Sequence, residues 1–119
     1  MTLEFTLSAP TRSRVGATVF LVLRLRNPSR RPVEAHFLGR TIVFDIVAAR
    51  ADGSIVWRRL AKGAEPSILQ IRTLAPGETM EWRDGWQPRE PGLYRLQGIL
   101  PSDEPEPRRT PWRSLTVTP

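Results

Sequence analysis

Side chains with catalytic or metal-binding chemistry are scarce in this sequence. His36 is the only histidine, and there is no cysteine. A transition-metal site needs several imidazole or thiolate ligands, and a serine nucleophile needs a neighbouring base. The serines do not occur in a Gly-x-Ser-x-Gly pattern, and the glycines do not form a phosphate-binding loop. We therefore expect no enzymatic activity, no metal and no cofactor, and we interpret His36 as a structural residue of a strand.

The only cluster of acidic residues is Asp103, Glu104 and Glu106, which alternate with prolines. A calcium loop would place Asp or Asn at alternate positions, followed by a glycine and a distal glutamate. That pattern is missing here, so we interpret the cluster as solvated loop charges.

Arginine dominates the charge, with 17 arginines against a single lysine and a net charge of +6. This excess favours acidic partners. Because the arginines are scattered, solvated strand faces are the main interpretation, and a surface for an anionic partner is the alternative.

Binding to nucleic acid would need exposed aromatic rings among the arginines, whereas most aromatic residues here alternate as core residues do. The sequence thus argues against a nucleic-acid partner. The expected core rings are Phe5, Phe44, Trp57, Trp82 and Tyr94; the candidates for exposure are Phe20, Trp86 and Trp112.

Two segments could present basic side chains to a protein partner. Residues 58–67 carry Arg58, Arg59 and Lys62, and residues 102–111 carry Pro105, Arg108 and Arg109. Prolines favour an extended, solvated chain in the segment 100–111, and they are expected to keep it out of a strand ladder. A rigid, protruding segment docks on a protein partner at low entropic cost. A plain solvated connection is the alternative for each segment.

The elements that must hold these segments have the period of two that is typical of strands. Between residues 17 and 26, for example, Leu21, Leu23 and Leu25 form one apolar face, and the other face becomes basic at its far end with Arg24 and Arg26. Asp52-Gly53 predicts a hairpin, because that turn needs a residue with positive φ. Turn signals recur every 8 to 12 residues, which predicts an all-β, immunoglobulin-like antiparallel sandwich of about eight strands in a single domain, 1–119. The expected strands are 3–7, 17–26, 42–49, 55–59, 69–71, 78–83, 94–100 and 114–118.

The stretch "EPGLYRLQG" (90–98) has the spacing of a tyrosine corner in such a domain, with Glu90, Gly92 and Tyr94 at alternate positions. The position two residues later, where a bridging cysteine often stands, holds Leu96. We expect Leu96 to pack against Leu21 or Leu23 of the opposite sheet. Burying two leucines stabilises by roughly 1.5–3 kcal/mol each, which is comparable with the ~2–4 kcal/mol of a disulfide.

From residue 23 to residue 100 the order of landmarks resembles the BsuPI family of intracellular proteinase inhibitor domains. The matching pieces are "LRLRNPSRRPVEAHF", "GRTIVFDIVAARADGSIVWRR", "LAPGETMEW" followed by Trp86, and "PGLYRLQGIL". The resemblance implies an immunoglobulin-like sandwich and, for the family's namesake, inhibition of an intracellular serine protease. One departure is at Leu60 and Ala61, where members often have a serine.

Two functional hypotheses follow. The chain inhibits a serine protease through one of the two basic segments, or it is a non-inhibitory interaction or assembly module that recruits a protein through a sheet face or edge. The absence of cysteine and of a basic, apolar leader predicts a cytoplasmic chain, and a secreted domain without its leader would have the same composition. The longest apolar run, 19–23, is too short to cross a bilayer.

Overall fold

The computed structural model describes residues 3–60 and 68–119, and within them every regular element is a strand. This confirms the all-β prediction, with eleven strands where about eight were expected. Their bounds are β1 Glu4–Ser8, β2 Arg12–Arg14, β3 Val19–Arg26, β4 Val33–Leu38, β5 Asp45–Arg50, β6 Ile55–Arg58, β7 Leu69–Leu74, β8 Thr79–Trp86, β9 Gly92–Leu100, β10 Arg108–Arg109 and β11 Arg113–Thr118.

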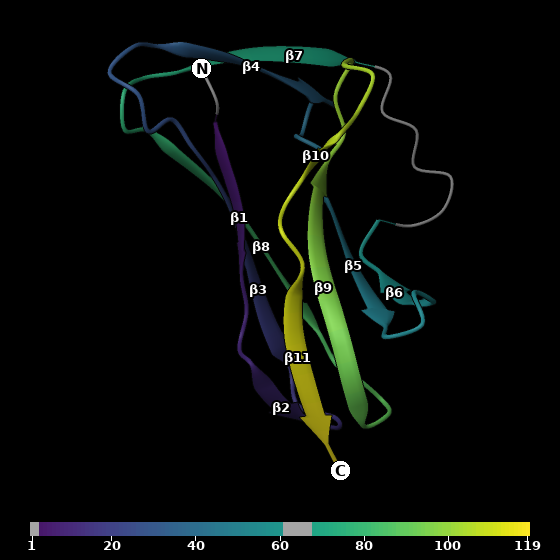
Figure 1. Ribbon diagram of the computed structural model, residues 1–119. Helices are drawn as coiled ribbons and strands as arrows, with labels where there is room; N and C mark the ends of the chain where they lie inside the picture. The colour runs from purple at the N-terminus through teal and green to yellow at the C-terminus, as the bar shows by residue number, and fades with distance from the viewer. Residues whose placement is uncertain (1–2, 61–67) are drawn as a thin grey trace.

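The strands form two packed layers (Figure 1). One layer has the order β1-β3-β8, and the two-stranded β4-β7 sheet lies across its upper end. The other has the order β2-β11-β9-β5-β6, with the short β10 paired to β9. All described pairs are antiparallel except β2 with β11. We call these layers the three-stranded and the five-stranded sheet.

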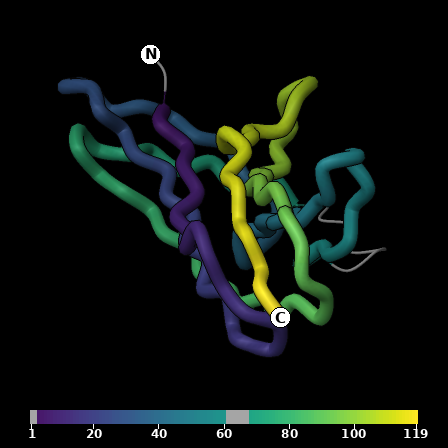
Figure 2. The backbone as a smooth tube through the Cα atoms, turned by 60° about the horizontal axis from the view of Figure 1, so that its bottom comes forward, coloured from purple at the N-terminus to yellow at the C-terminus, as the bar shows by residue number. Residues whose placement is uncertain are grey.

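The chain changes sheet within its first fifteen residues. β1 pairs with β3 in one layer, and β2 pairs with β11 in the other. Figure 2 shows the resulting neighbourhood of the purple N-terminal and yellow C-terminal strands. Pro10 lies between β1 and β2, where a missing N–H costs no ladder hydrogen bond. The two ends of the described chain thereby close one side of the sandwich.

The core lies between the layers and follows the predicted alternation. Leu21, Leu23 and Leu25 of β3 are fully buried, and they share one hydrophobic cluster with Leu96 of β9. Apolar packing therefore occupies the region where immunoglobulin-type domains often carry a disulfide bridge between their sheets. The Tyr94 hydroxyl donates to the Glu90 carbonyl at 2.6 Å, which confirms the tyrosine corner.

Asn27 fixes the junction where β3 passes into β4 and β7 passes into β8. Its buried amide donates to the carbonyls of Arg31 at 2.7 Å and Leu74 at 3.0 Å, and its Oδ1 accepts from the Ser29 amide at 3.0 Å. Its backbone N–H donates to the Glu78 carbonyl at 3.0 Å. One side chain thus ties the bend of one strand pair to the turn of its neighbour.

The Asp52-Gly53 hairpin is present between β5 and β6. Arg50 and Ser54 close it, with the Arg50 amide donating to the Ser54 carbonyl at 2.9 Å. Gly53 has φ of 89°, the left-handed conformation that the sequence predicted. The Asp52 carboxylate accepts from both the amide and the hydroxyl of Ser54, and these hydrogen bonds lower the pKa of Asp52.

Three expectations need correction. Trp86 is buried, with 8% of its surface exposed, because its ring packs between Trp57 and Tyr94. The strand expected from residue 42 begins at Asp45, since residues 39–42 form a turn in which the Val43 amide donates to the Leu38 carbonyl. Trp57 and Trp82, both expected in the core, are half-buried and pack against it. Phe20 and Trp112 are exposed as expected, at 73% and 39%.

Candidate protein-binding sites

The segment 101–107 is a loop closed at its base by backbone pairing. Arg108 and Arg109 form β10 and pair with Leu100 and Ile99 of β9. This corrects the expectation that prolines keep the whole segment out of a ladder, since positions 108 and 109 retain their N–H groups. Just beyond β10, the Thr110 amide donates to the Gly98 carbonyl at 3.0 Å, and the Thr110 hydroxyl accepts from the Gly98 amide at 2.9 Å.

A second attachment holds the loop near its middle. The His36 Nδ1 lies 2.9 Å from an Asp103 carboxylate oxygen, and the His36 Nε2 lies 3.7 Å from Glu34. The hydrogen bond to Asp103, together with the negative charges of Asp103, Glu34 and Glu104, raises the pKa of His36 above its ordinary value of 6.5. His36 therefore has a structural role, as expected, in joining β4 to the loop. Asp103, Glu104, Pro105 and Glu106 remain exposed.

On the other predicted segment, Arg58 is paired with a buried aspartate. The Asp45 carboxylate is 1% exposed and accepts from the Arg58 guanidinium at 2.6 and 3.2 Å. It also accepts from the backbone amides of Ile46 at 2.8 Å and Leu60 at 2.9 Å. Asp45 thus holds the chain on both sides of Arg59.

Arg59 points into the protein rather than into solvent. Its Nε donates to Asp84 at 2.6 Å, its Nη1 donates to the Phe44 carbonyl at 2.8 Å, and its guanidinium carbon lies 3.6 Å from the Phe44 ring centroid. An ion pair and a cation–π contact therefore orient this side chain. Lys62, the third basic residue predicted in this segment, lies outside the described residues.

The fold brings the two predicted segments to the same end of the five-stranded sheet. Arg109 is paired with Ile99, and Ile99 is paired with Asp45, the partner of Arg58. Directly opposed residues in a ladder share a face, so Arg58 and Arg109 lie on one surface of this sheet. Arg108 is half-buried, and Pro105 lies in the loop.

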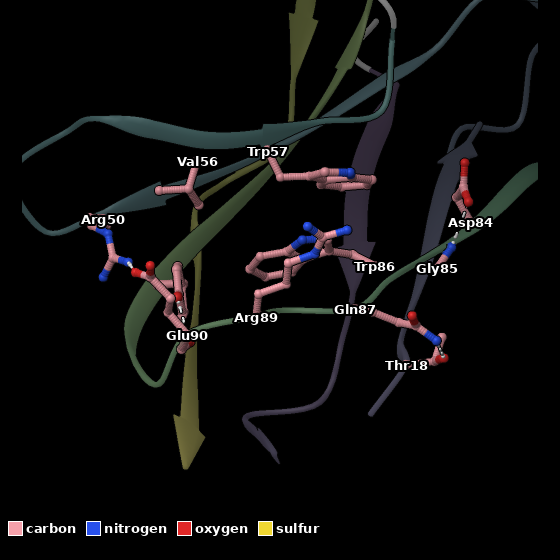
Figure 3. A pocket seen from close by; sticks show the side chains of 11 residues that line it. Thr18, Arg50, Val56, Trp57, Asp84, Gly85, Trp86, Gln87, Arg89 and Glu90 are labelled. Atoms are coloured by element: carbon pink, nitrogen blue, oxygen red, sulfur yellow. Dashed lines mark hydrogen bonds and ion pairs between the residues drawn. The ribbon is translucent and has the colours of Figure 1, made fainter. Parts of the chain in front are cut away.

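A groove opens between β6 and β8, which form the margins of their sheets in the described structure (Figure 3). It has a volume of about 940 Å³, and its floor is formed by the stacked rings of Trp57 and Trp86, with centroids 5.7 Å apart. Arg50 forms an ion pair with Glu90, and its guanidinium carbon lies 5.2 Å from the Tyr94 ring centroid. We call this feature the tryptophan groove. An aromatic floor with charged walls can hold an extended polar segment.

Some of these contacts could be anticipated from the sequence, and others could not. A carboxylate within the apolar run 42–49 was the available signal for the Asp45 ion pair. No local pattern joins His36 to Asp103, which are 67 positions apart, or Trp57 to Trp86. Among the described residues, no three His, Asp or Glu side chains are grouped so that they could hold a metal ion, and no helix has the length and apolarity of a membrane span.

The family model described as BsuPI, intracellular proteinase inhibitor, matches residues 5–105. The chain belongs to the BsuPI family. The match runs from β1 through β9, includes the His36–Asp103 contact and ends within the loop 101–107, so β10 with Arg108 and Arg109, and β11, lie beyond it. No curated protein matches the sequence.

Solved structures support the same architecture. A CARDB domain from Pyrococcus furiosus, crystallised with di-metal ions, is 12% identical, with a TM-score of 0.54 over 98% of this chain and 93% of that one. The solution structure of that domain gives 0.56 at 12% identity, over 98% and 94%. A β-glucuronidase from Bacteroides uniformis is 14% identical, with a TM-score of 0.52 over 95% of this chain and 13% of the enzyme. At these identities the likeness concerns the fold alone.

Proposed function

We propose that this BsuPI-family protein inhibits a serine protease of the cytoplasm by presenting the loop 101–107 together with Arg108 and Arg109. The description of the family, intracellular proteinase inhibitor, supports an inhibitory function. The observation that carries the proposal is the double attachment of the loop, by β9–β10 pairing at its base and by His36–Asp103 near its middle.

This attachment matters because an inhibitor must differ from a substrate. A loop that is already ordered loses little conformational entropy on docking. Pro101, Pro105 and Pro107 fix φ within the segment and reduce its freedom further. After attack on its backbone, a closed loop also keeps its two ends together, which favours religation over release.

Arg108 and Arg109 are the proposed contacts for an acidic specificity pocket, and Pro105 is the proposed contact at the exposed part of the loop. In the other segment, the ion pairs of Arg58 with Asp45 and of Arg59 with Asp84 favour a positioning role. Lys62 stays a predicted contact.

The test is a titration of the protein against a panel of subtilisin-like and trypsin-like serine proteases. We expect residual peptide hydrolysis to fall to near zero close to one equivalent, with the loop 101–109 intact by mass spectrometry. Arg108→Ala/Arg109→Ala should abolish inhibition, and Arg24→Ala/Arg26→Ala, which removes the same charge from the three-stranded sheet, should preserve it. Inertness toward the whole panel, or rapid cleavage in the loop, would refute the proposal.

The second candidate is a non-inhibitory interaction module, and the tryptophan groove favours it. A bound chain could stack on the half-buried Trp57 and pair with the margin of β6. Trp57→Ala would then abolish partner binding without affecting any protease, whereas under the first proposal Trp57→Ala should leave inhibition intact.

A further inference from the structure

The arginines are distributed unequally between the outer faces of the two sheets. On the three-stranded sheet each of them lies beside a carboxylate. Arg24 lies 2.7 Å from Glu81 and Arg26 lies 3.4 Å from Glu4, both across strands. Arg83 lies 3.1 Å from Glu81 along β8. This face therefore presents little unbalanced charge.

The outer face of the five-stranded sheet has a different composition. The register places Arg12 and Arg14 beside Thr116 and Thr118, and Arg95 opposite Ser114 and Ala49. Their neighbours along each strand, Ser13 and Tyr94, are at least half-buried on the inner side, which fixes the direction of the alternation. The same rows include Arg109 and Arg58. We call the exposed side chains of these rows the arginine face; they are Arg12, Arg14, Ile55, Arg58, Leu93, Arg95, Arg109, Ser114, Thr116 and Thr118. The side chains between them in the same rows are buried; they are Asp45, Val47, Ala49, Gln97 and Ile99.

Asp45 is the one carboxylate in these paired rows of the described structure, and it is buried beneath Arg58. None of the five arginines has a carboxylate directly opposite it in the described ladder, and Arg58 reaches Asp45 from the neighbouring position of the row. Leu93 and Ile55 are exposed within the face, at 54% and 49%. Arginine around exposed apolar side chains is the composition that distinguishes protein interfaces from the rest of a protein surface.

From this asymmetry we propose that the part of the arginine face around Arg12, Arg14 and Arg95, which excludes Arg109 and the loop 101–107, is a docking surface for an acidic protein surface. The charge of the face selects an anionic partner. A single-stranded nucleic acid fits less well, because sheet faces that bind it offer rings on which bases stack. Trp112 is the ring beside these rows, and the Arg95 guanidinium carbon already lies 4.8 Å from its centroid.

The size of the face predicts the strength of the contact. The exposed part around Arg12, Arg14 and Arg95 lies on β2, β11 and the start of β9. Three strands about 4.8 Å apart, with about five residues each at roughly 3.3 Å, give a flat area of the order of 200 Å². That is about a quarter of the area that one partner contributes to a standard interface. We therefore expect a weak, fast-exchanging complex whose affinity falls steeply with salt.

The test compares two triple variants that have the same net charge as each other. Poly-L-glutamate is the probe for an acidic protein surface, and a thymidine oligonucleotide with the same charge as the peptide is the probe for a nucleic-acid partner. Arg12→Ala/Arg14→Ala/Arg95→Ala should weaken binding of poly-L-glutamate roughly tenfold or more at low salt. Arg24→Ala/Arg26→Ala/Arg83→Ala should change it less than about twofold. Should the first triple variant fail to fold, Arg12→Gln/Arg14→Gln keeps the Arg95–Trp112 contact and should still weaken binding.

Equal losses in the two triple variants would show that net charge alone drives binding and would overturn the proposal. No binding of poly-L-glutamate by the parent protein, or tighter binding of the oligonucleotide, would overturn it as well. Protease inhibition by each variant reports on the loop independently, so either proposal can fail alone.

Discussion

Asn27 and Asp45 are buried polar side chains that satisfy backbone groups where strands bend or end. Each accepts or donates several hydrogen bonds, and no buried side-chain nitrogen or oxygen in the described structure lacks a partner. Leaving such a group without its partner costs about 1–3 kcal/mol, more than the net gain of forming one hydrogen bond. These residues therefore determine local geometry in a way that apolar neighbours could not replace.

Asn27→Ala should lower the free energy of unfolding by about 2–3 kcal/mol, because the buried Leu74 carbonyl loses its donor. Urea denaturation measures this. Ser29→Ala is the matched control. The Ser29 hydroxyl donates to the Asn27 Oδ1 and accepts from the Arg31 amide at the more exposed edge of the same junction, so its loss should cost less than about 1 kcal/mol. Similar effects of the two substitutions would show that Asn27 is not the centre of the junction.

At the scale of elements, close approach between the sheets depends on Gly98. A Cβ on Gly98 would lie 2.1 Å from a Leu23 methyl carbon and 3.1 Å from the Thr110 methyl carbon. β9 can therefore approach β3 and the chain after β10 only without a side chain at this position.

Gly98→Ala should destabilise the protein by about 1–3 kcal/mol through overpacking. Leu23→Ala alone should also destabilise it, by about 2–5 kcal/mol. In the double variant the new methyl group enters the space that Leu23 leaves, so the combined cost should be smaller than the sum. Denaturation of the four proteins gives the coupling free energy, and strict additivity would contradict the predicted contact.

The loop 101–107 is the element whose position should depend on pH. The folded-state pKa of His36 is raised, so the stabilisation from its charged contact with Asp103 is fully present below the ordinary value of 6.5. It is lost as the pH rises through the folded-state pKa. Because His36 is the only histidine, its imidazole proton resonance reports the titration without ambiguity.

Asp103→Asn should move the pKa of His36 down toward its ordinary value, since it removes the main cause of the shift. Glu106→Gln removes a charge from the same loop but no cause of the shift, so it should leave the titration nearly unchanged. A His36 titration that is identical in both variants would refute the attachment of the loop to β4.

Much of the element structure was predictable because strand alternation is a local property. Val19–Arg26 and Gly92–Leu100 show it clearly, and both are strands. β2 and β10 have three and two residues, and β2 pairs with a strand about a hundred positions away, so neither produces a local period. The His36–Asp103 and Trp57–Trp86 contacts escaped prediction for the same reason, since each joins residues that the fold alone brings together.

At the scale of the whole molecule, the charge of +6 acts differently on the two sheet faces. The guanidinium groups of Arg24 and Arg83 hydrogen-bond to Glu81 and lower its pKa, so the folded state gains from these charges. Arg12 and Arg14 lie two positions apart on the arginine face, without a carboxylate opposite them in the ladder. There the like charges repel one another, and the repulsion is screened by salt.

The two faces should therefore respond in opposite ways to the loss of one arginine. At low salt, Arg14→Ala should raise the melting temperature, because it relieves repulsion among like charges. Arg24→Ala should lower it, because it leaves Glu81 with one fewer partner. Both shifts should shrink as NaCl rises to about 0.3 M, where charges more than about 6 Å apart are largely screened. Thermal melts of the two variants at both salt concentrations measure the four shifts in melting temperature. Shifts of the same sign at low salt would mean that the two faces do not differ in electrostatic balance. That result would also remove the basis for assigning the arginine face to an acidic partner.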